Sequence, residues 1–182
     1  SQVGQLSGLA SLAGIGLGGE TGTKSQEAIE RIQSFGFFSK YFLPNVKLEN
    51  LMAVKEWKPD ENIILYDKNL FDIKTKKWVR NVRFPLKVVP SDQEAFKEEY
   101  KKILNINVGK DTGFITISIV HKSPIIAKKW LDLIILNINE SMRALDKENA
   151  QNSIDFLNET TSLTNIKSIN DVISDLLESQ MQ

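Results

Sequence analysis

The chain has no cysteine, a single histidine and no long apolar run among its 182 residues. The absence of cysteine excludes disulfides, thiol catalysis and cysteine-ligated zinc or iron–sulfur sites. One histidine cannot build a histidine-rich metal centre, and His121 has no serine or acid beside it to make a recognisable catalytic triad. No segment approaches the ~20 apolar residues that cross a bilayer, and the first residues do not resemble a signal peptide. We therefore expect a soluble chain with no cofactor and no metal.

An excess of charge of one sign is also absent, because 23 basic residues balance 23 acidic ones. This balance removes any global attraction to nucleic acid or acidic lipid, and we expect no nucleic-acid partner. The charge is nevertheless uneven along the chain. Residues 51–110 carry 13 basic and 9 acidic side chains, whereas residues 145–182 carry 2 and 7. The positive middle and the negative end either pair between copies of the protein or are two solvated surfaces.

Glycine is scarce outside the first 22 residues, which hold seven of the ten glycines. Because glycine opposes regular structure on entropy grounds, we predict a flexible apolar loop over 1–22. Thr23 and Gln26 then form a T-x-x-Q capping box, which predicts a helix ending near Phe35. An aromatic-rich cluster follows and ends at Pro44. Its members are Phe37, Phe38, Tyr41, Phe42 and Leu43.

The middle of the chain has the pattern of short elements separated by turn residues. We predict a helix over 48–56, a strand over 63–66, a surface hairpin over 71–78 that turns near Lys76, and an extended segment over 82–89. Ser91 and Glu94 form an S-x-x-E box that opens a helix running to about Leu104. Residues 105–120 alternate as a β-hairpin with one buried face, which carries Ile115, Ile117 and Ile119.

Ser123 and Pro124 begin a long helix, with serine as the cap and proline in the first turn. Its apolar stripe includes Trp130, Ile134 and Ile138, which we expect to pack against the three hairpin isoleucines as the centre of the core. A helix from 124 to about 158 is roughly 50 Å long at ~1.5 Å per residue. We predict a bend over 160–165 and a second amphipathic helix from residue 166 onward.

The predicted fold class is α+β, with a small sheet covered by helices and a long protruding helix that forms an arm. The expected parts are the loop over 1–22, a base domain over 23–145 and a helical arm over 146–182. The base domain includes the root of the long helix.

Two sequence features that could indicate an enzyme, a phosphate-binding loop and a pair of carboxylates, are incomplete or absent. Gly22-Thr23-Lys24-Ser25 resembles the end of a phosphate-binding P-loop, but Thr23 separates the glycine from the lysine and no strand precedes the loop. The acidic residues contain no pair that stands out for glycoside chemistry. We therefore predict that the protein is not an enzyme.

Residues 74–87 carry six cations and no acid, interleaved with Trp78 and Phe84. The cations are Lys74, Lys76, Lys77, Arg80, Arg83 and Lys87. Cations beside aromatic rings suit single-stranded nucleic acid, anionic glycans or lipid headgroups. The same residues also fit a hairpin whose solvated basic edge blocks the pairing of sheets between molecules. An anion- or glycan-binding module is therefore an alternative function.

Short motifs occur in a defined order along nearly the whole chain. The first are Leu9–Ile15, Glu27-Ala28-Ile29-Glu30, Phe37-Phe38 and Leu51-Met52-Ala53-Val54. Next come Lys77-Trp78-Val79-Arg80, Pro90-Ser91-Asp92-Gln93-Glu94-Ala95 and Thr112-Gly113-Phe114-Ile115-Thr116. The last are Ser123-Pro124 with Ala127, Trp130, Ile138-Asn139 and Arg143, then Ser153-Ile154 and Phe156-Leu157. In this order the chain resembles the periplasmic domain of the Wzz-type chain-length determinants, the polysaccharide co-polymerases of bacterial surface-glycan assembly.

The resemblance implies a non-catalytic protein anchored in the bacterial inner membrane, with its large domain on the periplasmic face. Such proteins form ring-like homo-oligomers and set the length of polymers such as lipopolysaccharide O-antigen, which a partner polymerase makes. The implied partners are other copies of the chain and the polymerase, with the glycan itself as an open alternative. Family members also carry transmembrane helices at both ends and a final strand that this sequence lacks, so the resemblance implies a truncated portion.

Overall fold

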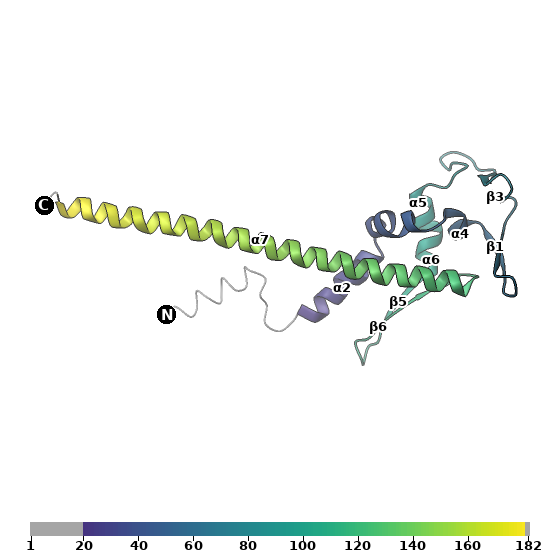
Figure 1. Cartoon of the computed structure of the whole chain (residues 1–182), viewed down its shortest axis with the longest axis horizontal. Helices are drawn as coiled ribbons and strands as arrows, with labels where there is room; N and C mark the ends of the chain where they lie inside the picture. The colour runs from purple at the N-terminus through teal and green to yellow at the C-terminus, as the bar shows by residue number, and fades with distance from the viewer. Residues whose placement is uncertain (1–19, 181–182) are drawn as a thin grey trace. The chain divides into compact units, whose positions relative to one another are not determined.

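The computed structural model describes residues 20–180, with side chains for residues 24–161. Residues 1–19 of the loop predicted over 1–22 lie outside the described residues, and the prediction was wrong for residues 20–22, which are the first turn of a helix. The chain divides into two compact units with a boundary between Glu140 and Ser141, slightly before the boundary expected after residue 145. The fold class is α+β, as predicted, with helices, small antiparallel sheets and a long C-terminal helix as the arm (Figure 1).

The first helix, α2 (Glu20–Ile32), begins three residues before Thr23, so the predicted capping box does not start it. After a short break come α3 (Phe35–Phe37), the π-helical turn η1 (Phe38–Phe42) and the 3₁₀ turn η2 (Leu43–Asn45). Ser34 is the real cap of this second segment, because its hydroxyl accepts a hydrogen bond of 3.1 Å from the Phe37 N–H. The aromatic-rich cluster is therefore a run of helical turns.

Helix α4 (Leu48–Met52) is shorter than the helix predicted over 48–56. The prediction was wrong beyond Met52 because β1 (Val54–Lys58) pairs antiparallel with β2 (Ile63–Tyr66), which offers it a ladder of hydrogen bonds. The second hairpin joins β3 (Phe71–Asp72) to β4 (Lys77–Trp78) and is confirmed. It turns at Lys76, which has a positive φ of 54°.

The predicted helix after Ser91 is confirmed as a continuous run of α5 (Asp92–Ala95), the π-helical turn η3 (Phe96–Tyr100) and α6 (Lys101–Ile103). The third hairpin pairs β5 (Leu104–Val108) with β6 (Ile115–Ile119), and Gly113 supplies the positive φ of 68° that its turn requires. The strands thus form three separate two-stranded sheets within the described residues, where the sequence predicted one small sheet.

The core of the Glu20–Glu140 unit is aromatic. The Tyr100 ring lies 4.9 Å from both the Phe38 and the Phe42 ring, centroid to centroid, and Phe42 packs edge-on against Trp130 at 5.5 Å. The Tyr100 hydroxyl donates a hydrogen bond of 2.9 Å to the Ile32 carbonyl, and burial raises the pKa of this hydroxyl. These contacts join η1, η3 and the start of the last helix into one packed centre.

The sequence predicted that Trp130, Ile134 and Ile138 pack against three isoleucines of β6, and this prediction was wrong for Ile115. Trp130, Ile134 and Ile138 are buried, as expected. Ile115 is exposed, however, and Ile117 and Ile119 are only partly covered. Alternation along β6 places the three isoleucines on one face, but nothing in that pattern says what covers the face. One neighbour of Trp130 in the core is the Phe42 ring of η1, which the sequence did not predict.

The last helix, α7 (Pro124–Gln180), begins where the sequence predicted. Ser123 is buried, and its hydroxyl accepts a hydrogen bond of 3.4 Å from the Ile126 N–H. The helix continues without a break for 57 residues, about 85 Å at 1.5 Å per residue. The predicted bend over 160–165 is therefore wrong. The threonines and serine there lower helix propensity by well under ~1 kcal/mol each, which is too little to end a helix without proline or glycine.

Candidate functional site

The structure separates the six cations of the 74–87 segment into two groups. Arg80 is buried, with 8% of its surface exposed, whereas the other five side chains are exposed. Those five are Lys74, Lys76, Lys77, Arg83 and Lys87. Among the described residues, none of the five makes an ion pair. They form the part of the predicted anion site that solvent reaches.

Arg80 makes internal contacts that are structural, and it is not an anion contact. The sequence prediction was therefore wrong for this residue. Its guanidinium pairs with both carboxylate oxygens of Glu94, and the Nη2–Oε2 distance is 2.7 Å. Its Nε donates to the Val88 carbonyl at 2.9 Å, and the Lys87 carbonyl accepts from the same guanidinium. Four of the five N–H donors of the guanidinium are occupied in this way and the side chain is buried, so Arg80 is not an exposed contact for a ligand.

We call the Arg80–Glu94 ion pair, together with the carbonyls that bind Arg80, the Arg80 clamp. Because Glu94 belongs to α5, the clamp is attached to the start of that helix. The hydrogen bonds from Arg80 hold the pKa of the Glu94 carboxyl below its usual value, and the Ser91 backbone adds to the effect. Ser91 in turn accepts a hydrogen bond of 3.3 Å from the Glu94 N–H. The S-x-x-E box is therefore confirmed as a helix cap, and its acid has a second task that the sequence pattern does not reveal.

The segment between the two ends of the clamp is a closed surface loop, residues 81–89. The sequence predicted an extended segment over 82–89, but the Leu86 N–H donates a hydrogen bond of 3.0 Å to the Arg83 carbonyl and closes a turn. Phe84 stands at this turn with 96% of its surface exposed. Trp78, the other aromatic residue of the basic segment, is partly covered and packs edge-on against Phe71 at 5.4 Å.

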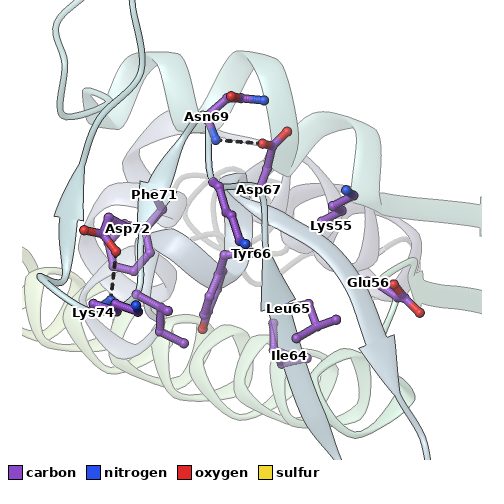
Figure 2. A pocket seen from close by; sticks show the side chains of 12 residues that line it. Lys55, Glu56, Ile64, Leu65, Tyr66, Asp67, Asn69, Phe71, Asp72 and Lys74 are labelled. Carbon is purple, nitrogen blue, oxygen red and sulfur yellow. Dashed lines mark hydrogen bonds between the residues drawn. The ribbon is translucent and has the colours of Figure 1, made fainter.

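A pocket of about 810 Å³ lies beside the β3–β4 hairpin. Its walls come from β1, β2, the loop that follows β2, and β3 with the start of its turn, and Figure 2 shows Tyr66 and Phe71 among the side chains that line it. The two rings pack edge-on at 5.4 Å. Lys55, Lys68 and Lys74 also line the pocket, so Lys74 connects it to the basic segment. Sequence reasoning missed this pocket because its residues come from three elements whose pairing no local pattern reveals.

The two aspartates of the pocket stabilise turns. Asp67 accepts a hydrogen bond of 2.8 Å from the Asn69 N–H, and Asp72 accepts one of 2.9 Å from the Lys74 N–H (Figure 2). The Thr75 hydroxyl also donates to Asp72, and this bond is the main reason why the pKa of that carboxyl is lowered. Both carboxylates therefore act as fixed acceptors, which suits the binding of a polar molecule better than proton transfer.

The side chain of His121 makes contacts that are structural. Its Nδ1 accepts a hydrogen bond of 3.0 Å from the Ser123 N–H, so Nε2 is the nitrogen that donates to the Asn50 carbonyl, also at 3.0 Å. The ring packs edge-on against Trp130 at 4.8 Å. The histidine thus ties α4 to the start of α7.

Within the described part of the chain, no group of three or more metal-binding side chains is close enough to hold an ion. In the same residues, no helix has the length and apolar character to cross a membrane. Comparisons with protein-family models, with curated proteins and with solved structures find no match to this chain.

Proposed function

We propose that this chain is the periplasmic part of a Wzz-type polysaccharide chain-length determinant. In this role it is a non-enzymatic, ring-like homo-oligomer on the periplasmic face of the bacterial inner membrane. It regulates the length of a lipopolysaccharide O-antigen type polymer that a membrane polymerase makes. The order of the sequence motifs and the α+β fold with a helical arm support this proposal.

The observation that carries the proposal is the apolar surface left along α7. Trp130, Ile134 and Ile138 are buried, but six other large apolar side chains of the helix are between 42% and 59% exposed. They are Ile125, Ile135, Leu136, Ile154, Phe156 and Leu157. A helix that stays in water normally places polar residues on its outer faces. Further copies of the same chain would cover these side chains.

The exposed residues do not share one side of the helix. Each residue advances about 100° around an α-helix, so Phe156 lies about 160° from Ile154 when measured the shorter way round. The helix therefore has apolar side chains on two nearly opposite faces. A protomer in a ring contacts two neighbours through two different surfaces, whereas a two-fold dimer uses one surface twice. The distribution on α7 fits the ring.

Sedimentation velocity of the chain tests this assembly. We expect an oligomer larger than a dimer, which Ile154→Ser with Leu157→Ser breaks on one face and Phe156→Ser breaks on the other. The matched control replaces Glu148, Asn152 and Glu159 by serine, since these are exposed polar residues of the same stretch. A chain that stays monomeric at all concentrations, or a control that dissociates the oligomer equally, would contradict the ring.

The regulatory role is tested in the parent cell. Deleting the gene is expected to change the modal length of the surface polysaccharide on a gel while sugar composition and linkage stay constant. Restoring the wild-type gene should restore the length, and restoring the Phe156→Ser variant should not. Altered linkage at unchanged length would point to an enzyme and would refute the proposal.

A second candidate function is the binding of an acidic glycan at the pocket lined by Tyr66 and Phe71 and at the adjoining β3–β4 hairpin. Lys74, Lys76 and Lys77 are exposed there, and the adjoining pocket offers an aromatic wall and fixed acceptors. We expect salt-dependent binding of an acidic oligosaccharide that weakens when these three lysines become serine. Replacing Lys97, Lys101 and Lys110 by serine removes the same charge elsewhere and is the control. Equal affinity at low and high salt would exclude this mode of binding.

A further inference from the structure

We propose that the loop 81–89 is a membrane-surface anchor, which inserts Phe84 into the interface of a bilayer that contains anionic lipid. This inference goes beyond the proposed function and does not depend on it, because it uses a different surface from α7. It also does not use the hairpin lysines of the glycan candidate.

The loop exposes more apolar surface than a solvated turn needs. Phe84 is almost entirely exposed, and Leu86, Val88 and Val89 are between 48% and 56% exposed. Singly exposed apolar residues are ordinary on protein surfaces, but four large ones within six residues form a local patch. A phenylalanine at the tip of a turn can enter the boundary between headgroups and acyl chains without moving the rest of the fold.

The charges of the loop fit the surface of an anionic membrane. Arg83 precedes Phe84 directly and Lys87 follows three residues later, and both side chains are exposed. No acidic residue occurs between Asp72 and Asp92 in the sequence. Cations near a membrane that contains anionic lipid each strengthen binding by roughly fivefold at low salt. The loop therefore combines an apolar tip with headgroup-binding cations on both sides of it.

The Arg80 clamp keeps the loop in this form. The guanidinium reaches the carbonyls of Lys87 and Val88, so both ends of the loop are fixed to one buried side chain, and Glu94 holds that side chain in place. A loop that is closed at its base loses less conformational entropy on insertion than an open one. Phe84 is therefore exposed on a loop whose ends are held by hydrogen bonds to Arg80.

The apolar residues favour a lipid surface over the other anions that the basic segment could bind. Stacking of successive nucleotide bases needs more than one open ring, but Trp78 already packs against Phe71. A sugar ring could cover Phe84, yet it would leave the aliphatic side chains of Leu86, Val88 and Val89 in water. A bilayer interface covers all four.

Co-sedimentation of the chain with vesicles tests the anchor. We expect binding to vesicles of equal parts phosphatidylcholine and phosphatidylglycerol at low salt, and much weaker binding to phosphatidylcholine alone. Phe84→Ala should weaken the binding about tenfold, since burying a large apolar side chain is worth that much or more. Arg83→Ser with Lys87→Ser should weaken it roughly thirtyfold.

Exposed residues elsewhere in the same unit supply matched controls. Phe114 is 77% exposed in its turn, so Phe114→Ala removes another exposed ring, from a turn where Asp111 follows Lys110 directly. Lys97→Ser with Lys110→Ser removes two exposed charges elsewhere. Both controls should bind the vesicles as the wild type does. All of these positions are exposed, so unchanged thermal unfolding of each variant checks that the fold is intact.

A depth measurement completes the test. In Phe84→Trp the new indole should be quenched by brominated lipid in anionic vesicles, whereas the indole of Phe114→Trp should not, and the native tryptophans give the same background in both. Equal quenching in the two variants, or full binding by Phe84→Ala, would overturn the anchor. If a soluble acidic glycan bound at the loop with a dependence on Arg83 and Lys87 but not on Phe84, the loop would be a glycan site and the lipid proposal would be wrong.

Discussion

The clamp between Arg80 and Glu94 leads to a quantitative prediction about stability. Only 8% and 10% of the two side chains are exposed, and the pair is supported by carbonyl acceptors on the arginine side. Removing one partner leaves the other charge buried and unpaired, which typically costs about 3–5 kcal/mol. Arg80→Ala should therefore lower the free energy of unfolding by that amount. A basic residue that only served an exposed anion site would cost less than ~0.5 kcal/mol.

The pH dependence of the same variant gives an independent check. Because Arg80 holds the folded-state pKa of Glu94 below its ordinary value of 4.5, the pair stabilises the fold at pH values above 4.5. This contribution is lost as the pH falls through the lowered pKa. In Arg80→Ala, acid protonates the buried Glu94 and removes its unpaired charge. The difference in stability between the wild type and the variant should therefore narrow on acidification.

Urea unfolding followed by circular dichroism measures both effects, and a double-mutant cycle with Glu94→Gln isolates the coupling between the two side chains. An apolar pair, Arg80→Met with Glu94→Leu, is the informative control, since a buried ion pair can often be replaced by packed hydrophobic residues at little cost. A loss below about 1 kcal/mol in Arg80→Ala, or a loss that stays constant from neutral to acidic pH, would refute the reasoning.

Three further predictions concern the core and one turn. Trp130→Ala should destabilise the Glu20–Glu140 unit by about 3–5 kcal/mol in urea unfolding, because the indole packs against Phe42 in the core, and Val120→Ala, at an exposed position, is the control. Tyr100→Phe leaves the Ile32 carbonyl without its donor and should cost about 1–3 kcal/mol by the same measurement, without the cavity that Tyr100→Ala would add. Gly113→Ala should cost about 1–2 kcal/mol because of the positive φ alone, since no atom beyond the two neighbouring residues lies within 4 Å of the new methyl group, and Gly113→Asn should cost less. Equal costs for alanine and asparagine at this position would contradict that explanation.

The sequence predicted those elements that carry their own local signals. The serine caps at Ser91 and Ser123 and the turn at Lys76 are all confirmed, because side-chain capping and turn chemistry act over a few residues. The cap at Thr23 was wrong, since α2 already begins at Glu20. Such a motif marks a possible start, but it does not prevent a helix from beginning earlier.

Burial and pairing across the chain were less accessible to sequence reasoning. The alternation in β6 grouped Ile115 with Ile117 correctly, yet that face is only partly covered and Ile115 is exposed. Arg80 looked like one of six surface cations, because its partner Glu94 lies 14 residues away and only the folded loop brings them together. The aromatic-rich cluster was noted without a role, and its packing against η3 joins two helical segments that no local pattern relates.

The two π-helical turns, η1 and η3, also determine how this protein tolerates insertions and deletions. Each holds an aromatic pair four residues apart, Phe38 with Phe42 and Phe96 with Tyr100, at ring distances of 5.8 Å. A π turn closes its hydrogen bonds over five residues, one more than an α turn. Loss of one residue between the two rings of either turn would convert it to an α turn and end the four-residue spacing that pairs those rings. The number of residues in these two turns is therefore as constrained as their identity.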